Sequence, residues 1–314
     1  MSFEQTYKDI YELIIKNIKF LLITVLGATI LAIVFSSPYF IPPKYESKAV
    51  IYPKNLKPYA IESSTEQLLQ LLEGNDIRDS LIEKFDLLNH YEISKDDDYY
   101  RWKLEKKLES NLTITKTQFE SVEIEILDEN PKIARDMVVE LINQTNNKAA
   151  NLHKNKALEE MKGYELQLKS IKTRIDTLIN EIRAYSIKYG ILDYIMQSKE
   201  VTEGYMNLLE GNKVGTKGYE LALELYNNLQ DKGRYFHDLH HQMNLEREEY
   251  NKVLALYDEA FQKANTELTF TNVVVYPKIA DKKAYPVRWL IVLLSATGAF
   301  VLSIILLILK QKVF

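Results

Sequence analysis

The stretch ALEEMKGYELQLKSIKTRIDTLINEIRAYSIKY, residues 157–189, carries apolar or aromatic side chains at intervals of three and four residues. Such spacing puts these side chains on one face of a helix, in a heptad pattern. We expect this seam to comprise Ala157, Met161, Tyr164, Leu168, Ile171, Ile175, Leu178, Ile182, Tyr185 and Tyr189. A helix over residues 131–189 would be about 88 Å long at about 1.5 Å per residue. So long a rod needs a partner along its seam.

A second seam follows and can serve as that partner. In the same heptad frame it comprises Leu225, Leu229, Phe236, Leu239, Met243, Tyr250, Val253, Tyr257, Ala260 and Ala264. Five of the ten glycines lie between Gly190 and Gly218, where we expect the chain to turn back. Asn130 is a candidate N-cap for the first rod, and Pro131 suits its first helical position. The sequence therefore predicts a long antiparallel helical hairpin over residues 131–267.

Two uncharged apolar runs lie near the ends of the sequence. No charged residue occurs in residues 20–43 or in residues 289–309, and about 20 apolar residues suffice for a helix to cross a bilayer. The first run lacks an A-x-A cleavage site, so we interpret it as a retained anchor and not as a signal peptide. Lysines flank both sides of the anchors in nearly equal numbers, which leaves the topology open.

The segments beside the hairpin predict a small sheet. Alternating apolar and polar residues predict strands over residues 111–117 and 121–127, and we also expect strands over residues 45–52 and 268–276. Short helices are expected over residues 64–72 and 76–85. The last strand returns to pair near the earlier ones. We therefore expect an α+β membrane protein with a small mixed sheet close to the membrane.

The predicted division of the chain has seven parts. They are a tail over 1–19, a transmembrane helix over 20–41, a membrane-proximal α/β base over 42–130, the hairpin over 131–267, a returning strand and proline-containing approach over 268–288, a second transmembrane helix over 289–309 and a tail over 310–314. Neither tail is long enough to fold by itself.

Small residues recur every four positions in both anchors. The rows contain Thr24, Ala28, Ala32 and Ser36 in the first anchor and Ser295, Ala299 and Ser303 in the second, with Gly298 beside them. This spacing lets helices approach closely in lipid, although small residues are also simply frequent in such segments. If the pattern is functional, the two anchors pack together or against a neighbouring chain.

Composition excludes several classes of function. The chain has a net charge of -4 and no basic stripe with interleaved aromatic residues, which argues against a nucleic-acid partner. It has no cysteine, which excludes disulfides and thiolate metal sites. No nucleophile elbow, kinase signature or paired catalytic motif occurs, so we expect no catalytic residue and no cofactor.

Three segments invite a chemical interpretation and each has a simpler one. The segment from Gly211 to Gly218 resembles a phosphate loop but lacks the required spacing, which favours a flexible turn. His237, His240 and His241 lie within about one helical turn and could bind a metal, but histidines on a solvated helix face are common. The run Asp96–Asp98 could chelate a hard cation, but it also suits an acidic helix start.

The arrangement along the whole chain resembles the Wzz-type chain-length determinants, also called polysaccharide co-polymerases. It has their order of tail, anchor, strand, hairpin, helix start at Asn130, Pro131 and Ala134, long rod, returning strand and second anchor. The most specific stretches are residues 276–280, which contain Pro277, and residues 285–288, which contain Pro286 and Arg288, followed by the second anchor with Gly298.

The resemblance implies a non-enzymatic homo-oligomer, ring-like in form, in the bacterial inner membrane. Both tails would be cytoplasmic and the central domain periplasmic. The chain would regulate the length of O-antigen, in lipopolysaccharide biosynthesis, or of a related lipid-linked polysaccharide, together with a Wzy-type polymerase. Related kinases carry a P-loop domain after the second anchor, whereas this sequence ends at Phe314.

Two other functions stay open on the sequence. A capsule polysaccharide export co-polymerase, partnered with an ABC transporter, would share this architecture. A membrane-anchored coiled-coil scaffold of unrelated role would have the opposite topology. Ring size, glycan identity and preferred chain length leave no signal in the sequence.

Overall fold

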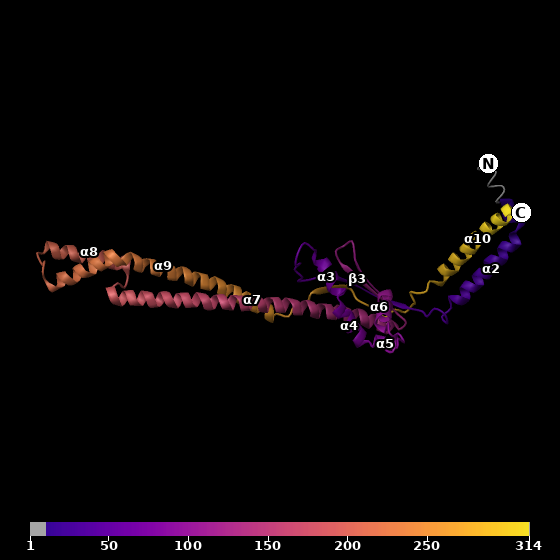
Figure 1. Cartoon of the computed structure of the whole chain (residues 1–314), viewed down its shortest axis with the longest axis horizontal. Coiled ribbons are helices and arrows are strands. Elements are labelled where there is room, and N and C mark those ends of the chain that lie inside the picture. Colours follow the sequence, from indigo (N-terminus) through magenta and orange to yellow (C-terminus); the bar gives the residue numbers. More distant parts are fainter. Residues whose placement is uncertain (1–10, 314) are drawn as a thin grey trace, which may run out of the picture. The chain divides into compact units, whose positions relative to one another are not determined.

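The computed structural model describes residues 11–313, so residues 1–10 and 314 of the two predicted tails lie outside the described residues. The chain forms two compact units. One consists of residues up to Ala149 together with those from Leu268 onward, and the other of Ala150–Glu267. Figure 1 shows the order of the elements along the chain.

A four-stranded sheet organises the first unit. Its strands lie in the order β2-β3-β1-β4, with β1 (Tyr45–Pro53), β2 (Leu112–Lys116), β3 (Val122–Asp128) and β4 (Thr271–Val275). The predicted small sheet is confirmed, but it is not mixed, because every pairing is antiparallel.

The path of the first rod explains why β4 is antiparallel to β1. The helix α7 (Pro131–Tyr189) follows β3 and runs back over the sheet, where Ala134, Met137 and Leu141 are buried in the core of this unit. The chain therefore returns to the sheet at the end where β3 begins, and β4 runs antiparallel to the central strand β1.

The core of this unit lies between the sheet, the first part of α7 and four short helices. These are α3 (Ser64–Leu72), α4 (Asn75–Lys84), α5 (Leu87–His90) and α6 (Tyr100–Asn111). In β3 every second side chain is buried, as its alternating sequence predicts, and in β1 Ser47, Ala49 and Ile51 are buried. The largest fully buried side chains here include Ile51, Leu68, Leu72 and Ile124, and each such burial stabilises the fold by about 1.5–3 kcal/mol.

The second unit is a helical hairpin, which confirms the prediction. It contains the distal part of α7, the helix α8 (Tyr194–Glu210) and the long helix α9 (Lys217–Asn265). Arg174 of α7 pairs with Glu246 of α9, and Glu181 further along α7 accepts a hydrogen bond from the earlier Tyr235. The two rods are therefore antiparallel.

The predicted turn between the rods is a helix over most of its length. The helix α8 begins where Asp193 accepts a hydrogen bond from the Met196 N–H, and α9 begins where Thr216 accepts one from the Tyr219 N–H. The glycines predicted that the chain turns back here, which it does, but the sequence did not predict that Gly204 lies inside a helix.

One long apolar helix precedes the first strand, β1, and another follows the last strand, β4. The helix α2 (Ile18–Phe35) ends before the predicted limit at residue 41, because Pro38 disfavours helical geometry at Ser37. The helix α10 (Arg288–Val313) begins one residue before the predicted start and continues through residues assigned to the tail.

Candidate functional site

The helices α2 and α10 are each long and apolar enough to cross a membrane. The 18 residues of α2 have a mean hydropathy of 2.5, and the most apolar 18-residue stretch within Arg288–Lys310 has a mean hydropathy of 2.7. At about 1.5 Å per residue, 18 residues span about 27 Å, close to the thickness of a bilayer's hydrocarbon core. The two helices lie side by side (Figure 1), and the Ser303 hydroxyl donates a hydrogen bond to Thr24 Oγ1 at 2.9 Å.

The predicted rows of small residues lie on the less exposed faces of these helices. Ala32 is only 8% exposed, and Ala28, Ser295 and Ala299 are half-buried. Gly298 is different, because a Cβ placed there would meet no described atom within 4 Å. The structure therefore does not bring Gly298 into the contact between the two helices of one chain.

The segments that lead into the two helices meet each other. The Lys44 N–H donates to the Tyr285 carbonyl at 2.9 Å, and the Ala284 N–H donates to the Lys44 carbonyl at 2.8 Å. Pro286, which directly follows this contact, is buried, and Pro277 is half-buried. The chain thus holds both approaches to the membrane-length helices together at one point.

The Lys44 side chain continues this link into the base. Its Nζ donates to Asn111 Oδ1 at 2.5 Å, at the end of α6. Burial and the nearby charge of Lys107 lower the pKa of Lys44. Lys44, which follows α2, therefore contacts the helix α6 of the base as well as the segment that leads into α10.

The predicted seam residues differ in burial, and Ile182 packs against the cluster of Ile191, Leu229 and Phe236. Ile171 is 4% exposed, and the other predicted members, Leu168, Ile175, Leu178, Ile182, Tyr250 and Tyr257, are half-buried. Beside the seam, the Arg174 guanidinium donates to both carboxylate oxygens of Glu246, at 2.9 and 2.8 Å, and holds the pKa of Glu246 below its usual value.

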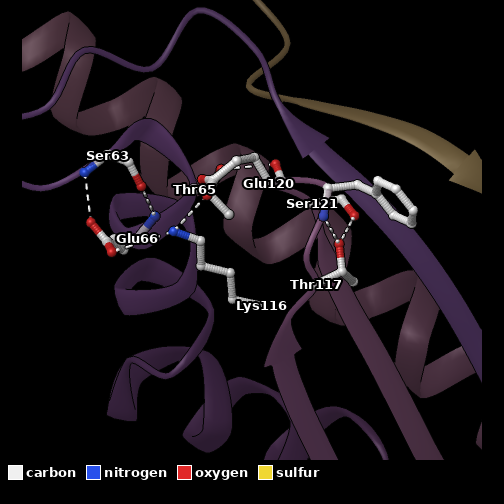
Figure 2. Close-up of polar contacts among 8 residues, drawn as sticks. Ser63, Thr65, Glu66, Lys116, Thr117, Glu120 and Ser121 are labelled. Atoms are coloured by element: carbon white, nitrogen blue, oxygen red, sulfur yellow. Dashed lines mark hydrogen bonds and ion pairs between the residues drawn. The ribbon is translucent and has the colours of Figure 1, made fainter.

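Polar contacts fix the start of α3 against the turn between β2 and β3, as Figure 2 shows. Ser63 and Glu66 form a reciprocal capping box, in which each side chain accepts from the other residue's N–H. The Thr65 hydroxyl donates to the Glu120 carbonyl at 2.9 Å, and Lys116 pairs with the Glu120 carboxylate at 3.0 Å. The capping box is visible in the sequence, whereas the contacts across the turn are not.

The sequence did not predict one hydrogen-bonded pair that involves a buried carboxyl group, that of Asp128. Asp128 is 1% exposed, and its Oδ2 lies 2.8 Å from His90 Nε2. Its other oxygen accepts from the Asn130 N–H at 2.8 Å, immediately before α7. The acidic residue before the helix start is a local signal, but nothing in the sequence points to His90 as its partner.

The three segments with a chemical interpretation have ordinary contacts. His240 stacks edge-on against Phe236, and His237 lies near the Tyr194 ring. Asp97 pairs with Lys103 and accepts from the Tyr99 N–H at the start of α6. Residues 211–216 form the loop between α8 and α9. Within residues 11–313, no group of three or more His, Cys, Asp or Glu is placed to hold a metal ion.

These features define an α+β protein with two membrane-length helices, a small antiparallel sheet and a long helical hairpin. Residues 7–94 match the family model of the Wzz chain length determinant protein. The resemblance predicted from the sequence is therefore confirmed over the part of the chain that contains α2 and β1.

Comparison with other proteins gives further similarities. No curated protein matches the chain. A full-length bacterial polysaccharide co-polymerase is 12% identical over 96% of both chains, with a TM-score of 0.47. The wild-type Shigella flexneri lipopolysaccharide O-antigen chain-length regulator WzzBSF is 13% identical over 76% of this chain and 99% of its own, with a TM-score of 0.32. A fragment of WzzB, a polysaccharide co-polymerase from Salmonella Typhimurium, is 14% identical over 77% of this chain and 100% of its own, with a TM-score of 0.27.

Proposed function

We propose that this chain is a non-enzymatic scaffold that regulates the length of O-antigen or a related lipid-linked polysaccharide, acting with a Wzy-type polymerase. The match of residues 7–94 to the chain length determinant family carries the proposal. The two membrane-length helices fit a protein of the bacterial inner membrane.

The scaffold would act as a homo-oligomer in the membrane. Copies of the base and hairpin would stand beside the polymerase, and the contacts between copies would set how long a growing glycan stays engaged. In this proposal Ala28, Ala32, Ser295 and Ala299 pack the anchors, and the hairpin seam keeps each rod pair rigid. The role of Gly298, which is exposed in one chain, would then be contact with a neighbouring copy.

The proposed topology places both tails in the cytoplasm. The segment between the two anchors would then be periplasmic, with the base nearest the membrane and residues 131–267 projecting as the hairpin. Pro277, Pro286 and Arg288 would form the approach to the second anchor. The contact of Lys44 with Tyr285 supports this arrangement, because it holds the two approaches together.

Deletion of the gene in its host tests the proposal. We expect the glycan ladder on a gel to lose its preferred length while polymer is still made, because the polymerase would act without its regulator. The full chain supplied in trans should restore the distribution. An unchanged ladder would contradict the proposal, and polymer trapped inside the cell would instead favour export with an ABC transporter.

A matched pair of variants links this effect to the anchors. Ala32→Phe places a large ring at an 8% exposed position on the contact face of α2, whereas Leu31→Phe changes its 58% exposed neighbour. We expect only Leu31→Phe to restore the ladder, provided that both variants reach the membrane in equal amounts. Full restoration by both variants would contradict a role for this anchor contact.

A further inference from the structure

A cavity of about 690 Å³ lies between α2 and α10, at the end where α10 begins. Its walls are mainly apolar and include Ile33 of α2 and Val292 and Ala296 of α10. Its polar end contains Ser36 and Arg288. The cavity thus combines a hydrocarbon-like surface with a cation at one end.

The cation at this end has no anionic partner among the described residues. Arg288 forms no ion pair there, and its Nε is shielded from solvent without any hydrogen-bond partner within residues 11–313. A shielded guanidinium N–H without an acceptor is costly, so this position favours a ligand that accepts hydrogen bonds.

A second cation lies close to the first. Burial and the charge of Arg288 lower the pKa of Lys283, which precedes α10 and donates to the Pro286 carbonyl at 3.3 Å. Neither residue pairs with a carboxylate in the described part of the chain. Arg288 is also the first residue of α10, where the helix dipole favours negative charge. The Arg288 charge and the first turn of α10 at this end of the cavity therefore suit an anion.

We infer that this cavity binds the phosphate headgroup of a membrane lipid. The phosphate would accept hydrogen bonds from the Arg288 guanidinium, whose planar fork suits phosphate oxygens. The hydrocarbon chain of the same lipid would lie along Ile33, Val292 and Ala296. Trp289, which also lines the cavity, would lie at headgroup depth, where tryptophan is enriched in membrane proteins.

The apolar walls favour a lipid over a free phosphate ion. An inorganic anion would contact only the polar end of the cavity and would leave its apolar walls without an apolar ligand. A lipid has a charged headgroup for the polar end and a hydrocarbon chain for the walls. An arginine at the end of a membrane helix can also simply reach the headgroup layer. Binding of a lipid in the cavity would depend on the side chains of the cavity walls, whereas simple contact of Arg288 with the headgroup layer would not. This inference does not rest on the proposed function.

Trp289 provides a direct measurement of occupancy. The chain contains two tryptophans, so Trp102→Phe leaves Trp289 as the only one. The full chain would be reconstituted in phosphatidylcholine vesicles and titrated with phosphatidic acid that carries brominated acyl chains, or with brominated diacylglycerol of the same chains. We expect phosphatidic acid to quench Trp289 at a mole fraction about five-fold lower than diacylglycerol does, as one strong cation–phosphate contact implies.

Two matched pairs of variants separate the cavity from general headgroup attraction. Arg288→Gln should abolish the preference for phosphatidic acid, whereas Lys310→Gln, at the other end of α10, should retain it. Ala296→Leu fills the cavity and should also abolish the preference, whereas Val301→Leu, 54% exposed, should retain it. The helical content of each variant, measured by circular dichroism, checks that it folds. The pair Ala296→Leu and Val301→Leu tests the cavity without changing the charge of the chain.

Three outcomes would overturn the inference. Equal quenching by the two brominated lipids would show that the phosphate is not recognised. A preference that survives Arg288→Gln or Ala296→Leu would place recognition outside this cavity. Relief of quenching by millimolar inorganic phosphate would show a site for the free ion and not for a lipid.

Discussion

Asn146 joins the first rod to the returning strand through its side-chain amide. Its Oδ1 accepts from the N–H groups of Phe270 and Thr271 at 2.8 and 3.0 Å. Its Nδ2 donates to Thr271 Oγ1 at 2.7 Å and to the Ile142 carbonyl at 3.1 Å. The amide thus satisfies two backbone donors at the start of β4, next to the buried Phe270 ring.

Replacement of this amide should destabilise the first unit. Asn146→Ala leaves two backbone N–H groups without an acceptor, and we expect a loss of about 2–4 kcal/mol in the free energy of unfolding. Asn147→Ala, at the exposed next position, is the control and should change it by less than about 0.5 kcal/mol. Denaturant unfolding of both variants in detergent measures the difference, and equal stability would show that Asn146 is not a structural link.

Glu140 makes stability depend on pH. Its side chain is 7% exposed and accepts from Lys84 Nζ and from Gln144 Nε2. Burial raises the pKa of Glu140, but the hydrogen bonds from Lys84 and Gln144 outweigh it, and the pKa lies below its usual value. The unfolded carboxyl has a pKa of about 4.3. Its contribution is therefore fully present above that pH and is lost as the pH falls through the lower folded value.

Glu140→Gln should remove this part of the pH dependence. At pH 7 we expect the variant to be less stable than the wild type by about 1–3 kcal/mol, because Lys84 loses its buried partner. On acidification below about pH 4.3 the difference should shrink, since the wild-type carboxylate becomes protonated. Glu83→Gln, exposed on α4, is the control and should follow the wild type. A constant difference across the whole pH range would contradict this account.

At the scale of elements, α8 is held against α9 by a contact at a glycine. A Cβ built at Gly233 would overlap the ring of Tyr194, the first residue of α8. The same region buries Ile191, Leu229 and Phe236. The absence of a side chain at Gly233 therefore lets the aromatic ring lie on the backbone of α9.

Gly233→Ala should loosen α8 even though alanine favours helices. We expect a loss of about 1–3 kcal/mol from overpacking, measured as faster hydrogen exchange of α8 amides and a lower unfolding midpoint. Gly163→Ala is the control, because its Cβ meets no described atom within 4 Å. It should stabilise the hairpin by about 0.5–1 kcal/mol. In a double-mutant cycle, Tyr194→Ala should cancel much of the cost, and additive effects would contradict the contact.

The elements with a strong local pattern could be predicted from the sequence. The seam of α7, its start at Pro131 and the alternation in β3 depend on residues close in the chain. The helix α8 could not be predicted, because the glycines around it indicate a turn. Its position depends on the contact between the Tyr194 ring and Gly233. The antiparallel direction of β4 also depends on tertiary structure, since it follows from how α7 crosses the sheet.

The candidate site could be predicted from the sequence only in part. The two rows of small residues are visible because each repeats within one helix. The contact of Lys44 with Tyr285 and the cavity at Arg288 are not visible, because each needs two segments from opposite ends of the chain. The sequence shows which residues an anchor contains, but only the paired anchors show which of them share a cavity.

The lack of cysteine allows a direct test of the proposed topology. Val214 is 60% exposed in the loop between α8 and α9, and Lys310 is exposed near the end of α10. If each membrane-length helix crosses the bilayer once, these two positions lie on opposite sides of the membrane. With both tails cytoplasmic, a membrane-impermeant maleimide should label Val214→Cys in cells whose outer membrane is permeabilised. It should label Lys310→Cys only after the inner membrane is disrupted.

The cysteine-free chain should stay unlabelled, and both variants should react fully when denatured. The reverse pattern would place the sheet and hairpin in the cytoplasm, where they could not meet a periplasmic glycan, and would favour a coiled-coil scaffold of unrelated role.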